Sequence, residues 1–283
     1  MRLVTALPLL ALACAPDPAP DLAVRAAAAV RVATWNVHDL FDEVDRTTPP
    51  GDLDAVPSPA AVEAKLDALA AVLVRLDADV VVLQEVENAA VLGRLAARAG
   101  YPEARLVEGL DARGIDVAAL SRLPVERYVS HLGEADALGR PLWPRDCVEV
   151  HVRVAGRPLV VVASHLSSAL SDDGTRRVLQ AARMREIADG VRRARPGTLV
   201  LAGGDLNDGP GSAALSPLLG DGGWLDLAAS GATPWGAGAS AERLDYLLAP
   251  RGETAVLGVA IAEGRDVAAA SDHRPVVLDA WLR

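Results

Sequence analysis

Aromatic side chains and positive charge are both scarce in this chain of 283 residues. Aromatic residues make up 3% of it, and its formal net charge is −10. Proteins that bind nucleic acid passively usually present a basic surface to the phosphates and stack bases on aromatic rings. The two deficits therefore argue against a passive nucleic-acid-binding module. They do not argue against an enzyme that touches few phosphates.

Lysine and cysteine are also rare. Lys65 is the only lysine, so arginine carries almost all the positive charge, a bias of composition to which we attach no functional meaning. The two cysteines, Cys14 and Cys147, are too few for a disulfide framework. Cys147 lies in an alternating apolar and polar run, residues 147–152, which favours strand packing over a role as a nucleophile.

The N-terminus has the pattern of an export signal. Arg2 precedes an apolar run, residues 3–13, that is too short to span a bilayer and ends in the small-x-small sequence Ala11-Leu12-Ala13. Cleavage there would leave Cys14 first, followed by a tether containing proline and aspartate, which resembles the lipobox of bacterial lipoproteins. We expect an exported protein, either anchored by a lipid on Cys14 or, if that cysteine is incidental, secreted or periplasmic.

No repeat or long linker divides the remaining chain, and its length and 51% hydrophobic content suit one large α/β domain. We therefore expect a signal peptide at residues 1–13, a tether at 14–29 and one folded domain at 30–283.

Strand and helix patterns alternate along this domain. Apolar runs predict strands at residues 30–37, 79–86, 115–120, 125–130, 147–154, 158–164, 198–202, 244–248, 255–261 and 275–282. Caps and helical periodicity predict helices at residues 58–77, 88–99, 175–193 and 212–219. Consecutive strands without helices imply antiparallel pairing, so we predict two mixed sheets packed face to face with helices outside. The last three strands are expected to complete the second sheet.

Short polar clusters stand at the ends of several predicted strands. They are Trp35-Asn36-Val37, Leu83-Gln84-Glu85, Ser164-His165-Leu166, Gly204-Asp205-Leu206-Asn207, Arg243-Leu244-Asp245-Tyr246 and Ser271-Asp272-His273. Each alone is as well explained by a strand-end turn, because Asp and Asn commonly cap backbone N–H groups there. Because all of them occupy the same structural position, they indicate one site.

This ordered set resembles the endonuclease/exonuclease/phosphatase superfamily, of the deoxyribonuclease I-like type, over residues 30–283. The resemblance implies a four-layer α/β/β/α sandwich, within the α/β (α+β) class. It also implies a catalytic domain that hydrolyses phosphodiesters or phosphomonoesters with a divalent cation. Nucleases, inositol-phosphate phosphatases and sphingomyelinases belong to this superfamily.

A hard cation would help such a reaction by neutralising charge on the phosphate and on the leaving oxygen. Glu85, after a buried apolar run, is a natural oxygen ligand, and the resemblance implies that Asn36 and Asp272 join it. We expect Mg²⁺, with Mn²⁺ or Ca²⁺ as alternatives. The family often has a further acid or amide two residues after the asparagine, where this chain has His38.

The resemblance also implies the catalytic groups. His273 would face the scissile phosphate as a general acid/base or as a hydrogen-bonding stabiliser, with Asp245 fixing its tautomer. Asp205 would orient or deprotonate the attacking water, and Asn207 would donate to a phosphoryl oxygen. The glycines before Asp205 are expected to let the backbone approach the substrate closely.

The resemblance implies that two further residues contact phosphate. One is His165 after its strand, where a lone histidine is otherwise structural, and the other is Arg145 before residues 147–154, which is otherwise a loop arginine on an exposed rim. The arginines of the helix at residues 175–193 are spread around it, which predicts a solvated surface helix.

The sequence thus favours an exported, monomeric phosphodiesterase that acts on nucleic acid, either DNA or RNA. A sphingomyelinase-like enzyme is an alternative, weakened by the lack of a long aromatic hairpin, and a small-molecule phosphatase is another. The inositol polyphosphate 5-phosphatase branch is disfavoured, because no Pro-Ala-Trp-Thr-Asp run precedes Arg243. An inactive cell-surface binding lipoprotein on the same scaffold is the alternative from a different class.

Overall fold

The computed structural model describes residues 29–45, 56–168, 174–228 and 243–282. The predicted signal peptide, Cys14 and all but the last residue of the predicted tether lie outside these ranges. Within them, no helix is both long and apolar enough to cross a membrane.

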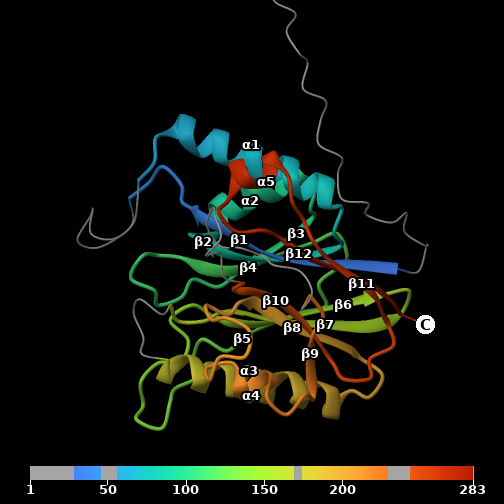
Figure 1. Ribbon diagram of the computed structural model, residues 1–283. Coiled ribbons are helices and arrows are strands. Elements are labelled where there is room, and N and C mark those ends of the chain that lie inside the picture. Colours follow the sequence, from blue (N-terminus) through green and yellow to red (C-terminus); the bar gives the residue numbers. More distant parts are fainter. Residues whose placement is uncertain (1–28, 46–55, 169–173, 229–242, 283) are drawn as a thin grey trace, which may run out of the picture.

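Two mixed sheets face one another in the centre of the molecule (Figure 1). The first has the order β11 (Val256–Ile261), β12 (Val276–Trp281), β1 (Ala29–Leu40), β2 (Val80–Val86), β4 (Asp116–Ser121) and β3 (Glu103–Leu106). The second has the order β5 (Arg127–Ser130), β6 (Cys147–Val154), β7 (Arg157–His165), β8 (Leu199–Asp205), β10 (Asp245–Pro250) and β9 (Trp224–Asp226). The pairs β1–β2 and β7–β8 are parallel, and the other pairs are antiparallel.

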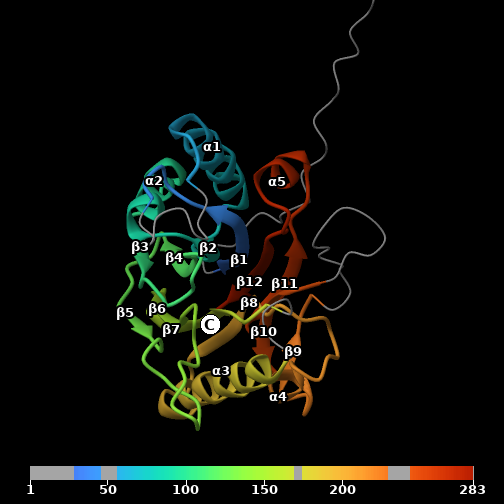
Figure 2. The same ribbon diagram turned by 90° about the vertical axis from the view of Figure 1, so that its left-hand side faces the viewer.

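Helices cover the outer face of each sheet, which completes the predicted four-layer sandwich (Figure 2). Those outside the first sheet are α1 (Pro59–Leu76), α2 (Ala89–Ala99) and α5 (Arg265–Ala270), and those outside the second are α3 (Thr175–Ala194) and α4 (Ser216–Leu219). α1 begins with a cap from Ser58 and a proline at its first position, and α2 begins with Asn88 accepting from two backbone N–H groups. α2 ends at Gly100 in the left-handed region.

Three sequence-based expectations were wrong. β11 and β12 belong to the first sheet, where β12 pairs with β1, so only β10 of the last three predicted strands lies in the second. The helix predicted at residues 212–219 forms only over its last four residues. Arg177 on α3 is buried rather than solvated, because its guanidinium reaches inward to Asp208 and to the carbonyl of Ser167.

Strand direction brings the polar clusters to one edge of the sandwich. β1, β2, β7 and β8 end at this edge, whereas β4, β6, β10 and β12 begin there. Alternate side chains of each strand face the opposite sheet. These inward rows are apolar along most of their length, as at Leu159 and Val161 of β7, and turn polar only at the edge, as at His165.

Gly203 and Gly204 allow the strands beside β8 to approach closely. A Cβ at Gly203 would lie 1.9 Å from the carbonyl oxygen of Tyr246 on β10, and one at Gly204 would lie 1.9 Å from that of Ser164 on β7. Gly204 also has φ +125°, which L-residues rarely adopt. The glycines therefore serve strand packing, and they set the position of Asp205; that they also let the backbone approach a substrate stays a prediction.

Gly204→Ala is expected to lower the free energy of unfolding by at least about 2 kcal/mol, because backbone strain and overpacking add. Urea denaturation followed by circular dichroism measures it. Gly252→Ala is the matched control, since Gly252 has φ +81° but nothing within 4 Å of an added Cβ. It should cost about 1 kcal/mol from strain alone. Equal losses in the two variants would show that strand packing is not what requires Gly204.

Candidate active site

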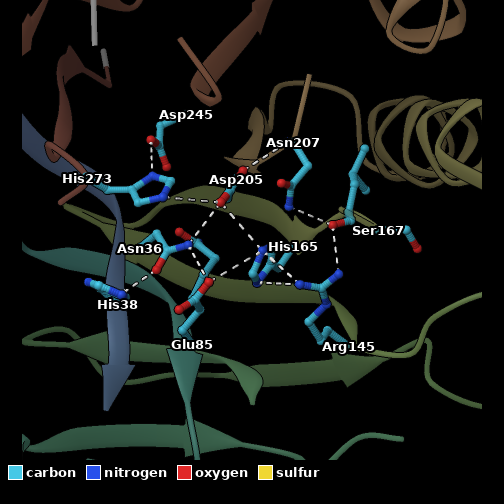
Figure 3. A network of polar contacts seen from close by, with 12 residues as sticks. Asn36, His38, Glu85, Arg145, His165, Ser167, Asp205, Asn207, Asp245 and His273 are labelled. Carbon is cyan, nitrogen blue, oxygen red and sulfur yellow. Dashed lines mark hydrogen bonds and ion pairs between the residues drawn. The ribbon is translucent and has the colours of Figure 1, made fainter. Parts of the chain in front are cut away.

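Asn36 joins the two sheets at the polar edge (Figure 3). It is buried, and its Nδ2 donates to Glu85 Oε1 at 3.0 Å and to Asp205 Oδ2 at 2.9 Å. Its Oδ1 accepts from the backbone nitrogen of His38 at 2.9 Å. Carboxylates only accept and a backbone N–H only donates, so these partners fix the orientation of the amide. Asn36 therefore positions two carboxylates that belong to different sheets.

Asp205, at the end of β8, is the centre of the site (Figure 3). Its Oδ2 faces Nε2 of His165 at 3.5 Å and Nε2 of His273 at 3.9 Å, besides the amide of Asn36. Its Oδ1 accepts from the backbone nitrogen of Asn207 at 2.9 Å. Burial, with the nearby charge of Asp245 second, raises the pKa of Asp205 to about 6. The carboxylate is therefore rigidly held and more basic than an exposed aspartate.

His273 and Asp245 form a buried dyad. Nδ1 of His273 lies 2.7 Å from Oδ2 of Asp245, which begins β10 opposite Asp205. Burial alone would lower the pKa of His273, but the charge of Asp245 and this hydrogen bond outweigh it and raise the pKa to about 10. The ring is therefore a cation at neutral pH, and its Nε2 is directed toward the centre of the site.

The backbone of His273 is anchored to β1. Its carbonyl accepts from Nε1 of Trp35 at 3.1 Å, and its nitrogen donates to Oγ of Ser271 at 3.0 Å. Ser271 Oγ in turn donates to the carbonyl of Asn36 at 2.8 Å. Ser271 and Trp35 thus hold the Ser271-Asp272-His273 segment against the strand that carries Asn36.

His165 and Arg145 lie together on the side of Asp205 that is opposite His273, and both are buried (Figure 3). Arg145 Nη1 is 2.9 Å from His165 Nε2, and Arg145 Nη2 donates to the carbonyl of Leu166 at 3.0 Å. Burial, and then the charge of Arg145, holds the pKa of His165 well below its usual value. His165 is therefore a neutral imidazole beside a buried cation.

Asn207 follows Asp205 in a left-handed conformation, with φ +52°. Asn and Asp are the non-glycine residues that tolerate this region best. Its side-chain nitrogen donates to the same Leu166 carbonyl at 2.9 Å, which directs the amide toward the His165 side of the site.

Glu85 is aimed into the site by an irregularity in β2. It has φ +65°, and the pairing of β2 with β4 shifts register between Gln84 and Val86. A β-bulge of this kind breaks the alternation of side chains and redirects one of them. Glu85 Oε2 also accepts from the backbone nitrogen of Asp39 at 3.0 Å. Burial opposes ionisation, yet the hydrogen bond from Asn36 and the charge of Arg113 lower the pKa of Glu85.

Two places in this site have the donors to hold a divalent cation. Asp205, Asp245 and His273 each offer a ligand atom within 4.8 Å of the others, and they are the only group of three His, Cys, Asp or Glu side chains to do so among the described residues. The dyad hydrogen bond and the positive charge of His273 oppose a cation there. The second place, around Glu85, Asp39 and the Asn36 oxygen, offers two carboxylates and an amide oxygen without a charged histidine, and hard cations prefer oxygen ligands.

Asp272 lies beside this second place. Its Oδ1 is 3.2 Å from Nδ1 of His38, whose side chain is exposed to solvent. The ammonium of Lys65 on α1 donates to the carbonyl of Ala270 at 2.6 Å, and the charges that act on it are those of Asp272, Asp39 and Glu85. Burial still lowers the pKa of Lys65. The sequence had assigned no role to this lysine, because only the fold places it near the carboxylates.

Sequence reasoning also missed Arg113. It lies in the loop before β4, its Nη1 is 3.9 Å from Asp39 Oδ1, and its charge acts on Glu85 and His165. Its side chain is 43% exposed, so it can reach a ligand from solvent. No motif marks an arginine in a loop, and proximity in the fold was needed to find it.

Comparison with solved structures gives the same fold. Truncated TDP2 of Caenorhabditis elegans is 16% identical with a TM-score of 0.63, over 89% of this chain and 98% of that one. TDP2 of D. rerio, in complex with a single-strand DNA product, is 18% identical with a TM-score of 0.62, over 89% and 98%. A mannosyl-6-phosphatase of Bacteroides thetaiotaomicron is 14% identical with a TM-score of 0.63, over 88% and 98%. No curated protein sequence matches the chain significantly.

At the sequence level, the model of the Endonuclease/Exonuclease/phosphatase family matches residues 33–273, which span every polar cluster of the site. The acidic and histidine groups of that edge suit the phosphoester hydrolysis that this family carries out with divalent metals. The chain therefore belongs to the endonuclease/exonuclease/phosphatase family of phosphoester hydrolases.

Proposed function

We propose that this protein is a divalent-metal-dependent phosphodiesterase that acts on nucleic acid. The arrangement around Asp205 carries the proposal. Three nitrogen groups converge on one carboxylate oxygen at the edge between the sheets, and a second carboxylate, Asp245, holds one of them charged. Such a centre offers a proton acceptor, a cation and hydrogen-bond donors within one small volume.

The chain's own residues divide the chemistry as follows. Ionised Asp205 orients the attacking water and accepts its proton, since a base with a pKa near 6 is largely ionised at neutral pH. His273, held by Asp245, presents a charged N–H to the phosphate oxygens or to the leaving oxygen. His165, Arg145 and Asn207 hold the phosphoryl oxygens from the opposite side. A divalent cation bound by Glu85, Asp272 and Asn36 would neutralise charge on the phosphate and on the leaving group.

Nucleic acid is favoured as the substrate by the cationic side of the site. Arg145 is buried at the centre and Arg113 stands at its exposed rim, so two arginines line the way to the reacting phosphate. A phosphodiester chain has further phosphates on either side of the scissile one, and arginine binds them well. That the D. rerio TDP2 structure holds a single-strand DNA product supports the same choice.

A small-molecule phosphatase is the second candidate, and the mannosyl-6-phosphatase neighbour supports it with an equally similar fold. Export through the predicted signal peptide, with or without a lipid on Cys14, forms part of the proposal. An inactive binding protein is disfavoured, because Glu85, Asp205 and His273 are all present.

The test is a matched substrate panel on the purified protein: plasmid DNA, RNA, sphingomyelin vesicles, a sugar phosphate, and the chromogenic pair bis(p-nitrophenyl) phosphate and p-nitrophenyl phosphate. We expect DNA or RNA cleavage and preference for the diester, abolished by EDTA and restored by Mg²⁺ or Mn²⁺. Glu85→Gln, which keeps the shape of the side chain, should need far more metal. Hydrolysis of monoesters alone would support the second candidate, and inactivity on every ester with every metal would refute both.

A further inference from the structure

Asp39 is directed into the site by an unusual end of β1. His38 and Asp39 both adopt left-handed conformations, with φ +54° and +55°, although neither is glycine. The pairing of β1 with β2 shifts register between Asn36 and Leu40, across the same residues. Each such residue costs of order 1 kcal/mol or more and persists only where the surroundings enforce it. Here the bond from the Asp39 nitrogen to Glu85 Oε2, 3.0 Å long, fixes the turn.

The turn places Asp39 against Glu85, since its backbone nitrogen is bonded to Glu85 Oε2 and the charge of Glu85 acts on its carboxyl group. Two neighbouring carboxylates repel one another, and a cation bound by both relieves that repulsion. Asp39 Oδ1 is a buried atom that accepts no hydrogen bond within the described structure, and Arg113 Nη1, 3.9 Å away, is its partner in a long ion pair. Burial, and then the charge of Glu85, raises the pKa of Asp39.

His38 is placed differently. Its ring is half exposed and faces Asp272, whereas its backbone nitrogen is bound to Asn36. Carboxylate oxygen is the ligand type that suits Mg²⁺ and Mn²⁺ best, and the acid next to His38 supplies one: its side chain is 39% exposed, but its Oδ1 atom is buried.

We propose that Asp39 is a carboxylate ligand of the divalent cation together with Glu85. Because of the left-handed turn, Asp39 supplies this ligand in place of the residue at position 38, which is a histidine in this chain. The inference rests on the proposed function, because it assigns a residue to the cation which that function requires. It also gives a reason for the two strained residues beside Asn36, since the turn that they form holds Asp39 against Glu85.

Direct metal binding tests the proposal independently of activity. Mn²⁺ binding to the full chain is measured by electron paramagnetic resonance of the free ion, for wild type, Asp39→Asn, His38→Ala and Glu85→Gln. We expect Asp39→Asn to weaken Mn²⁺ binding by about 10-fold or more, and His38→Ala by much less. Loss of binding in Glu85→Gln but not in Asp39→Asn would overturn this inference and leave the proposed function intact. A wild-type protein that binds no Mn²⁺ would overturn both.

Thermal unfolding separates a ligand from a merely structural residue. In EDTA, Asp39→Asn should unfold at the same temperature as wild type or a higher one, because the amide removes repulsion between two carboxylates. With Mg²⁺ present, wild type should gain stability by mass action and Asp39→Asn should gain less. A lower unfolding temperature of the variant in EDTA, with an equal gain from Mg²⁺, would show that Asp39 serves the fold and not the cation.

Discussion

His273→Ala is expected to lower kcat on the best substrate of the panel by about 10²- to 10⁴-fold, the usual contribution of a positioned acid, base or charged donor. The variant removes the imidazolium whose Nε2 points at Asp205 and leaves Asp245 buried without its partner. Because Arg145 and His165 remain available to bind the substrate phosphates in this variant, KM should change much less than kcat. Initial rates over a range of substrate concentrations measure the two separately.

His131→Ala is the matched control for this variant. His131 is also a partly buried histidine between carboxylates, Glu134 and Glu149, but its ring lies on the α3 side of the second sheet, where Arg183 binds Glu134. It should retain wild-type kcat. If both histidine variants lost activity equally, folding and not chemistry would explain the loss. A His273→Ala enzyme within threefold of wild type would remove His273 from the mechanism.

Asp245 links this prediction to pH. The pKa of His273 is raised to about 10, so its charged form is present below that value and is lost as pH rises through it. Activity should therefore fall only in strongly alkaline solution. Asp245→Asn removes the charge that raises this pKa, and the alkaline loss of activity should move to lower pH.

The position of the site was predictable from the sequence because strand alternation is a local property. In β1, β7 and β8 the row of side chains that faces the other sheet is mainly apolar until the edge, where Asn36, His165 and Asp205 take the place of a core side chain. Polar residues in phase with a buried row need partners, and a cluster of them at the same end of several strands indicates that they partner one another there. The positions of helices α1 and α2 were predictable for the same reason, because their capping residues Ser58 and Asn88 can be recognised in the sequence.

The rest depended on contacts between distant segments. β12 pairs with β1 across more than two hundred residues, and an apolar run gives no information about which sheet it joins. The turn at Asp39 and the bulge at Glu85 place non-glycine residues at positive φ, which no sequence pattern signals. Arg177 looked like one of many surface arginines until the loop after β8 placed Asp208 within its reach. For the same reason, only the fold shows that the carboxylates of Asp272, Asp39 and Glu85 lie around Lys65.

Asp205→Asn is the second variant expected to have a large effect, with kcat lowered by about 10²- to 10⁴-fold. The amide has the shape of the carboxylate and its oxygen can still accept from Asn36, but its NH2 then faces the backbone N–H of Asn207, and it cannot take a proton from water. The loss should therefore appear in kcat of a protein that is still folded, as circular dichroism and a cooperative thermal transition would show. Retention of a tenth or more of the activity would mean that another group accepts the proton.

The pH profile gives an independent check of the same role. In the absence of metal the pKa of Asp205 is about 6, because burial and the charge of Asp245 disfavour its ionised form. A base must be ionised to act, so kcat/KM should rise with pH around the pKa of Asp205. A cation bound near Glu85 favours the ionised form and will move this acid limb of the profile to pH 6 or below. A kcat/KM that stays constant as pH falls from about 7 to about 4 would mean that a group other than Asp205 accepts the proton.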